Sequence, residues 1–280
     1  MKKILIPLDF KFNRYHAIEY AVKFFKPEEC EFYFLNTYTY NIGGLNALQL
    51  LQADDDWFEK PKNDSIDGLG GVIQKFTQTS PNKKHRFNAI SECSDLIEGI
   101  WKTIKEVNID LVILTLKNRI DNKVDRYSRN AKRVLENIRE CPVMIIPSSA
   151  HLKKCPEFVL ISNFEIEMPE AKIDNWYELV KIAKGTVKLV VLCGLNRMTP
   201  IQKANLKKVC SQIEVYTGTS ISTEYLETED DLKHFVNSHS EYIICVMDRR
   251  PDFWRRYGLS QSRIINLGPF EATPLIALHR

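Results

Sequence analysis

A carboxylate and an amide occupy equivalent places after the first apolar run of each half of the chain. Asp9 follows the run Ile4–Leu8, and Asn163 follows the run Phe158–Ile161. A carboxylate at the end of a buried strand can bind a ribose hydroxyl or cap the next helix, and asparagine keeps the hydrogen bonding without the charge. No second carboxylate or histidine is tied to Asp9 by a motif. The two positions therefore indicate binding rather than acid–base catalysis.

Two later loops are rich in basic side chains, which are the groups that hold anions. Between Lys117 and Arg133 the sequence carries seven basic residues and two aspartates, a net charge of +5 in 17 residues. A second loop, from Asp248 to Arg263, carries five arginines and two aspartates. Such loops could bind a phosphate, a nucleotide or an acidic partner. The alternative is that they form solvated faces with surface ion pairs, the usual fate of charge runs.

The composition of the whole chain limits the class of protein. Its 280 residues include 39 Lys and Arg against 36 Asp and Glu, so the net charge of +3 argues against nucleic-acid or membrane binding. The seven cysteines are odd in number and scattered, which predicts buried, reduced thiols and no metal site. Pro7 and Asp9 interrupt the only signal-like start, and no apolar run is long enough to span a bilayer. We expect a cytoplasmic protein.

The elements that must position these residues are repeated. A constant offset of 132 residues maps the apolar run 111–114 and Pro142 onto the run 243–246 and Pro274. The pattern predicts two tandem domains, residues 1–149 and a shorter second domain, residues 150–280, joined by a linker at 148–156. Each alternates strands with amphipathic helices, which predicts two doubly wound, parallel, Rossmann-like α/β sheets.

The expected elements occupy similar places in the two halves. Strands are predicted at 4–8, 31–36, 86–90, 111–114 and 142–146, and then at 158–161, 188–193, 213–216, 243–246 and 274–278. Helices are predicted at 17–24, 95–107, 176–182 and 230–237. Asp9 and Asn163 are 154 residues apart, so the second half lacks about 22 residues of the first. The glycine-bearing stretch 41–71 is expected to be that insertion, a loop with some helix.

The segments 4–10, 17–21, 110–114, 131–135 and 141–146 resemble the universal stress protein family from end to end of the first domain. The second domain inherits the resemblance through the repeat. The resemblance implies five strands and four helices per domain in the adenine nucleotide alpha hydrolase-like fold. It also implies that the last strands, here 142–146 and 274–278, meet across a two-fold axis. In this chain we expect that pairing to be intramolecular, as a pseudo-dimer, and a homodimer is possible.

One subclass of the family binds ATP through the motif Gly-x2-Gly-x9-Gly-Ser/Thr after the fourth strand, with an acidic residue at the end of the first strand contacting the adenosine. Asp9 matches the acid, and Asn36 at the end of the second strand is a further candidate. The glycines fall on Thr115, Asn118 and Ser128, followed by Arg129. In the second domain the acid becomes Asn163, and the motif falls on Met247, Arg250 and Ser260, followed by Gln261.

The absence of every motif glycine should weaken phosphate binding by the backbone of this loop. Glycine lets a backbone take positive φ and approach a phosphate closely enough for its N–H groups to donate. The chain also lacks a Walker loop, an HxGH signature and a Gly-x-Ser-x-Gly elbow. We therefore expect a non-enzymatic stress-response or regulatory protein that acts by binding and needs no cofactor. The alternatives are an adenine-nucleotide switch that binds ATP in the first domain only, and a scaffold that docks an acidic partner on the arginine loops.

Overall fold

The computed structural model describes residues 1–10, 15–40, 55–80, 82–116, 127–239, 241–248, 265 and 269–279. They form two compact units. Unit 1 comprises residues 1–15 and 26–113, and unit 2 comprises residues 16–25 and 114–280. The predicted boundary between residues 149 and 150 falls inside unit 2 and stays a prediction.

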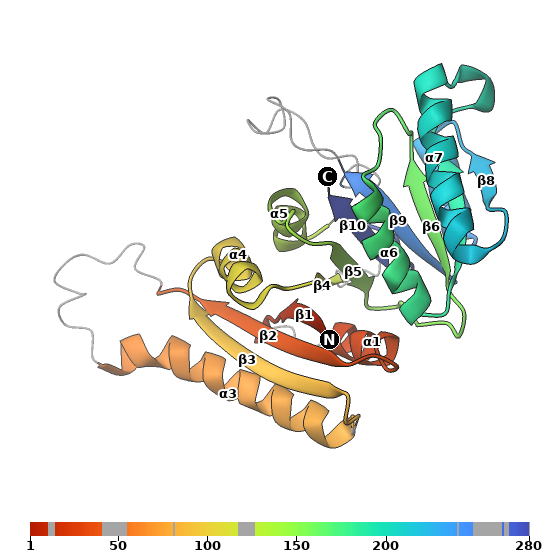
Figure 1. Ribbon diagram of the computed structural model, residues 1–280. Coiled ribbons are helices and arrows are strands. Elements are labelled where there is room, and N and C mark those ends of the chain that lie inside the picture. The colour runs from red at the N-terminus through yellow and green to blue at the C-terminus, as the bar shows by residue number, and fades with distance from the viewer. Residues whose placement is uncertain are drawn as a thin grey trace, which may run out of the picture. The chain divides into compact units, whose positions relative to one another are not determined.

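Unit 1 is built on four strands in the order β3-β2-β1-β4, and the described pairs are parallel. Two helices accompany them, α3 on one face and α4 on the other (Figure 1). The bounds are β1 Lys2–Pro7, β2 Cys30–Tyr38, α3 Asp55–Thr79, β3 His85–Cys93, α4 Leu96–Val107 and β4 Leu111–Leu116, the last of which crosses the boundary between the units.

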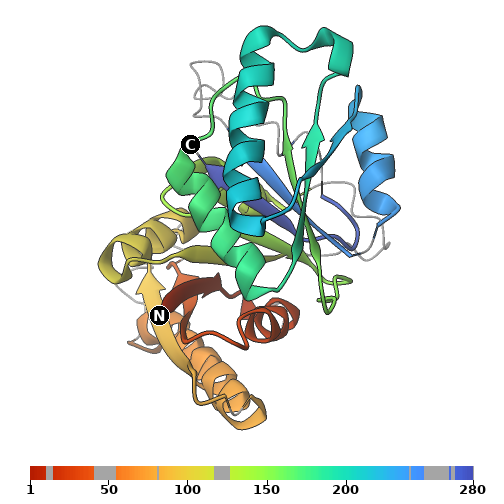
Figure 2. The same cartoon turned by 45° about the vertical axis from the view of Figure 1, so that its right-hand side comes forward.

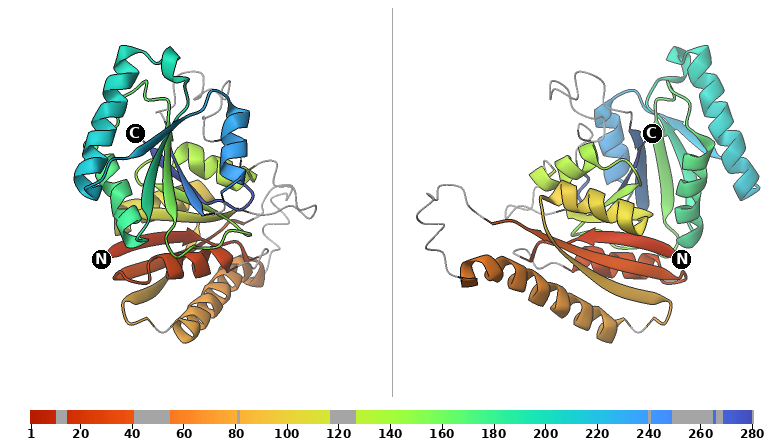
Figure 3. Two further views of the ribbon diagram at one scale, coloured as in Figure 1. Left: turned by 90° about the vertical axis from the view of Figure 1, so that its right-hand side faces the viewer. Right: turned by 60° about the vertical axis from the view of Figure 1, so that its left-hand side comes forward.

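Unit 2 holds six strands in the order β5-β10-β9-β6-β7-β8. In Figure 2 and in the left panel of Figure 3, α6 and α7 cover one face of this sheet and α8 covers the other. The bounds are α1 His16–Phe24, α5 Arg129–Asn137, β5 Val143–Pro147, β6 Glu157–Ser162, α6 Glu170–Ile182, β7 Thr186–Val191, η2 Leu195–Arg197, α7 Pro200–Thr217, β8 Ser222–Tyr225, α8 Glu229–Asn237, β9 Tyr242–Asp248 and β10 Leu275–His279.

The strands are apolar on both faces because helices cover both faces of the sheets. Consecutive residues of β1, Ile4 to Ile6, are at most 1% exposed, and Phe158 to Ile161 of β6 are equally buried. Such continuous burial is typical of parallel sheets. The predicted α/β class is therefore confirmed. No helix in the described part of the chain is both long and apolar enough to cross a membrane.

The pair of β5 and β10 departs from the parallel pattern. Ile145 lies opposite Leu275 and Val143 lies opposite Ala277 in an antiparallel ladder, whereas β10 and β9 run parallel. These are the two closing strands that are expected to meet because of the resemblance noted for the sequence. That the two halves form a pseudo-dimer through them stays a prediction.

The predicted strand at 213–216 is wrong, because this segment is the last turn of α7. Val209 and Ile213, four residues apart, are buried on the inner face of the helix, whereas Val215 is 81% exposed. Helical burial thus overrides the β-branched and aromatic composition of a short run. The third strand of the second half is β8, which follows the left-handed Gly218 at the end of α7.

The expectation for residues 41–71 is also wrong where it can be compared. Residues 55–71 belong to α3, and Gly68, Gly70 and Gly71 lie inside this helix rather than in a loop. Residues 41–54 lie outside the described residues. The second half does not dispense with a helix here, since α7 connects β7 to β8 as α3 connects β2 to β3. Packing of a narrow stripe, including Leu69 and Val72, outweighs the low helix propensity of glycine.

Replacing the three glycines of α3 by alanine is expected to change the free energy of unfolding in opposite directions. A Cβ at Gly70 or Gly71 would meet nothing within 4 Å, so replacing either by alanine should raise the free energy of unfolding by up to about 1 kcal/mol. A Cβ at Gly68 would lie 2.6 Å from the Phe10 ring, so Gly68→Ala should lower the stability instead. Urea unfolding of the three variants checks this, and a similar gain in all three would contradict the packing of Phe10 on Gly68.

Candidate functional site

The end of β1 is held in place by an amide of β2. Asn36 Nδ2 donates to the carbonyl oxygen of Leu8 at 2.9 Å, and the N–H of Leu8 donates to the carbonyl of Leu35 at 2.7 Å. Asn36 is only 9% exposed. The structure therefore places Asn36 beside the main chain that carries Asp9, where it fixes the backbone. Asp9 itself is exposed.

The remaining candidates of the first half belong to unit 2. Thr115 is half-buried near the end of β4. Ser128 is the N-cap of α5, with φ −60° and ψ 157°, and its Oγ accepts from the N–H of Ala131 at 3.2 Å. The position of the third motif glycine thus has an ordinary extended backbone and a capping role. Arg129 begins α5 and is exposed. Asn118 lies outside the described residues.

The loop after β6 carries the equivalent site of the second half. Ser162 Oγ accepts from the N–H of Phe164 at 3.0 Å, and Asn163 Oδ1 accepts from the N–H of Glu165 at 3.4 Å. Phe164 takes the left-handed backbone with φ 53°, although its side chain is fully buried. A residue of this size adopts that conformation only where the surrounding contacts require it.

Two amides of α7 clamp this loop. Gln202 Nε2 donates to the carbonyl oxygen of Asn163 at 2.8 Å, and Asn205 Nδ2 donates to the carbonyl oxygen of Phe164 at 2.9 Å. Gln202 also completes the capping box with Thr199 at the start of α7. Neither amide is among the site residues predicted from the sequence. The pattern Thr-x-x-Gln at 199–202 marks the start of a helix and so points to Gln202 as a capping residue, but it does not indicate the contact of either amide with this loop.

Asn163 is the least satisfied group of this loop. The residue is 7% exposed, and its Nδ2 is buried without a hydrogen-bond partner among the described residues. An amide can occupy such a position at a moderate cost, whereas an unpaired carboxylate would be far more costly. The burial therefore explains why asparagine rather than an acid is suited to the end of β6.

A carboxylate lies at the same edge of the sheet, two strands away from Asn163. Glu227 follows β8, and its Oε1 lies 2.5 Å from the point that a Cβ on Gly194 would occupy. Gly194 follows β7, so the Glu227 side chain covers the end of that strand. Arg197 Nη1 approaches Glu227 Oε2 at 3.6 Å, an exposed ion pair. This negative charge does not favour a phosphate at the ends of β7 and β8.

Much of the two basic loops lies outside the described residues, and so do Arg250 and Ser260. Only the end of the first loop is described, where Arg129, Lys132 and Arg133 lie on α5 and none of them is buried. Whether either basic loop holds an anion stays a hypothesis.

Two buried cysteines, Cys30 and Cys245, do not have the properties of activated nucleophiles. Burial raises the pKa of Cys30 to about 12, and burial likewise raises the pKa of Cys245. These two thiols are therefore kept protonated and unreactive. All seven cysteines are free in this structure, but Cys93 and Cys155 are exposed, so the prediction that all are buried is wrong. Among the described residues, no group of histidine, cysteine or acidic side chains has the arrangement of a metal site.

Comparison with solved structures relates this fold to known proteins. A universal stress protein from Archaeoglobus fulgidus DSM 4304 superposes with a TM-score of 0.74 at 13% identity, over 99% of this chain and 98% of its own. A putative universal stress protein from Pseudomonas aeruginosa UCBPP-PA14 gives 0.61 at 11% identity, over 100% of this chain and 93% of its own.

The fold extends beyond proteins with that name. The cytoplasmic domain of a prokaryotic cation chloride cotransporter superposes with a TM-score of 0.53 at 9% identity, over 99% of this chain and 94% of its own. No protein-family model and no curated protein matches the sequence. The chain therefore has the universal stress protein fold over its whole length, and its function has to be argued from its own residues.

Proposed function

We propose that this protein is a non-enzymatic stress-response protein that acts by binding and whose nucleotide sites are degenerate in both halves. The observation that carries the proposal is the clamped loop after β6. The main-chain carbonyls of Asn163 and Phe164, which would border a ligand, accept hydrogen bonds from Gln202 and Asn205 of the same unit. This loop uses its polar groups for its own structure rather than for a ligand.

The first half supports the same proposal through Ser128. A phosphate site at the start of α5 would use backbone N–H groups of the first turn. The Ser128 hydroxyl already accepts from one of them, the N–H of Ala131. Arg129, Lys132 and Arg133 keep the region positively charged, so a weak anion site on side chains is the remaining route to a ligand.

Thermal unfolding with and without millimolar ATP tests this proposal. We expect no rise in the melting temperature, because the motif glycines are absent from both halves. The measurement is sensitive enough to decide, since a ligand at 100 times its dissociation constant would stabilise the fold by about 2.7 kcal/mol. A clear rise that Asp9→Ala abolishes would contradict the proposal and favour a nucleotide switch in the first half. Asp9→Asn is the matched control, because it keeps the hydrogen-bonding shape and removes only the charge.

A further inference from the structure

The outermost strand of unit 1 offers an unusually long edge. β3 has nine residues, His85–Cys93, and all nine are in register with β2. Among the strands that the structure describes, β2 is its single neighbour, so the opposite edge of β3 carries a row of backbone N–H and C=O groups. β8, the outermost strand of unit 2, has only four residues. Short edge strands avoid pairing with other chains, and β3 lacks this protection.

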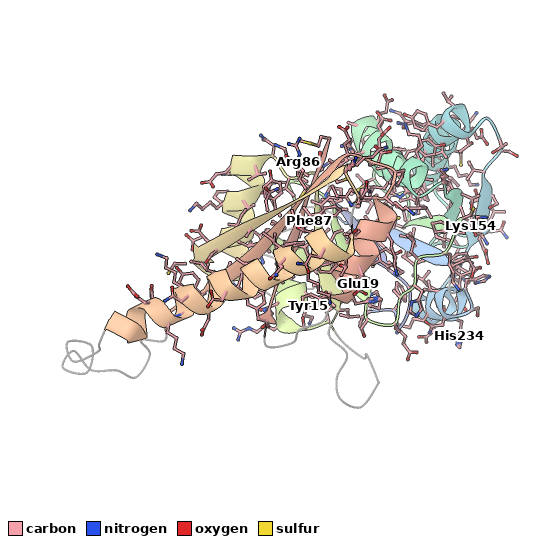
Figure 4. All side chains as sticks on the ribbon, turned by 90° about the horizontal axis from the view of Figure 1, so that it is seen from below. Tyr15, Glu19, Arg86, Phe87, Lys154 and His234 are labelled. Carbon is pink, nitrogen blue, oxygen red and sulfur yellow. The ribbon has the colours of Figure 1, made fainter. Side chains whose placement is uncertain are left out.

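Alternate residues of β3 face the two helices of unit 1. The Phe87 ring lies 6.3 Å from that of Phe76 in α3, whereas Glu92 accepts from Lys102 of α4 at 2.9 Å. Figure 4 shows Phe87 on the α3 side of the strand and Arg86 on its other side. Arg86 and Glu92, six residues apart, therefore share the α4 face of the strand.

The charged side chains of β3 are placed so that two antiparallel copies of this strand would have complementary charges. Arg86 and Glu92 lie at equal distances on either side of Ala89, the central residue of the strand. If two copies pair their β3 strands antiparallel about Ala89, each Arg86 lies opposite Glu92 of the second copy. The Arg86 side chain is 74% exposed, and its ion pair with Glu31 is long, with 3.8 Å between Arg86 Nη1 and Glu31 Oε1, so the guanidinium group can exchange this partner for a carboxylate of a second copy. The carboxylate of Glu92 is oriented by Lys102.

The exposed flank of α3 fits the same arrangement. Gly68 packs on Phe10, which follows the inner strand β1, and Lys75 lies 3.7 Å from the ring of Tyr15. Ile66, two residues before Gly68, is on the opposite side of the helix and is 48% exposed. The Ile66 side chain is therefore turned away from β1, toward the outer edge of β3.

The spacing of strands and helices agrees with a second copy as the occupant. α3 packs on both β3 and β2. Strands are about 4.8 Å apart, so a helix midway between β3 and β2 lies about one strand spacing from a two-fold axis outside β3. Two copies of α3 would then be about 10 Å apart, close to the distance at which helices pack. Their Ile66 flanks would meet.

We propose that β3 is a self-association edge at which two copies of this chain pair antiparallel about Ala89. The ladder joins the sheets of the two unit 1 regions, the Arg86–Glu92 pairs fix its register, and the flanks of α3 that carry Ile66 close one side. The partner is thus a second copy of the chain rather than a peptide of another protein.

Charge exchange at the strand ends tests the proposed register. Sedimentation equilibrium should show a reversible dimer for the wild type. R86E and E92R, each placing like charges opposite one another twice, should raise the dimer dissociation constant by about tenfold or more. A mixture of R86E and E92R chains should associate as well as the wild type, because every cross-strand pair then has opposite charges. Restored association also shows that both variants are folded.

A disulfide tests the position of the axis. Ala89→Cys places a thiol directly opposite its own equivalent, within the range of Cα separations that a disulfide spans. Mild oxidation should link the two chains of this variant. The wild type is the control, because the exposed Cys93 of one copy would be eight residue steps, or about 27 Å, from Cys93 of the other. A monomeric wild type, a mixture that does not associate, or an unlinked Ala89→Cys dimer would each overturn the proposal.

Discussion

Replacing Trp176 by alanine is expected to lower the free energy of unfolding by about 3–5 kcal/mol, the usual cost of truncating a fully buried aromatic residue. Trp176 lies on α6 with no exposed surface, and its indole N–H donates to Cys245 Sγ of β9 at 2.9 Å. The variant loses the apolar contact between α6 and the sheet and leaves a cavity in the core of unit 2. Urea unfolding followed by circular dichroism measures the loss.

The chain offers a matched control of the same residue type. Trp101 of α4 is 44% exposed and lies beneath the ammonium group of Lys105 at 3.3 Å from the ring centroid. Trp101→Ala should cost about 1 kcal/mol or less, because little apolar area is lost and an exposed cation–π contact is weak. Equal losses in the two variants would contradict the burial of Trp176. Trp176→Phe should fall between them, since it keeps most of the volume and removes the N–H.

A second large effect is expected from Asn163→Asp, which introduces the acid that the first half carries at Asp9. Asn163 is 7% exposed, and its Nδ2 has no partner among the described residues, so an ionised oxygen there would be buried without a donor. We expect a loss of about 2–4 kcal/mol in the free energy of unfolding at pH 7. The substitution changes one atom and almost no volume, so packing cannot account for such a loss.

The loss should depend on pH in a defined direction. Burial disfavours the charged form and raises the pKa of the introduced carboxyl above its unfolded value of about 3.9. The folded state then binds the proton more tightly, so the stability of the variant relative to wild type falls as the pH rises through this range. The deficit should therefore shrink below pH 4 and grow toward pH 7. Unfolding curves of both proteins across this range give the comparison.

The same substitution at an exposed asparagine separates burial from charge. Asn137, in the last turn of α5, is exposed, and Asn137→Asp should cost about 1 kcal/mol or less, through the loss of the exposed hydrogen bond from Nδ2 to the Arg133 carbonyl and through the helix dipole. If Asn163→Asp were as mild, the end of β6 would be open to water. That result would contradict the closed loop on which the proposed function rests.

Much of the fold could be predicted from the sequence, because parallel strands that are buried on both faces appear in it as continuous apolar runs. The runs at 4–8 and 158–161 correspond to β1 and β6, and the helix predicted at 95–107 is α4, capped by Asp95. The secondary structure predicted from the sequence is wrong where local composition and tertiary packing favour different conformations. Ile213 to Tyr216 have strand-like composition but continue α7, and the glycines of α3 suggest a loop although Leu69 and Val72 anchor a helix.

The site was predictable in position but not in detail. The motif placed Asp9 and Asn163 after β1 and β6, and Ser128 just before α5, as the structure has them. The donors that clamp the second loop, Gln202 and Asn205, could not be assigned to it. They are about 40 positions later in the chain, and only the folded sheet brings α7 to the end of β6. Hydrogen bonds between elements depend on topology, which periodicity does not encode.

The antiparallel pairing of β5 with β10 has an evolutionary consequence. When a homodimer pairs one strand with its own copy, every substitution appears on both sides of the contact at once. Here the two sides are separate positions of one chain, so Val143 faces Ala277 and Ile145 faces Leu275. Each side can therefore change without the other, and the contact forms at an effective concentration that dilution of the protein cannot lower.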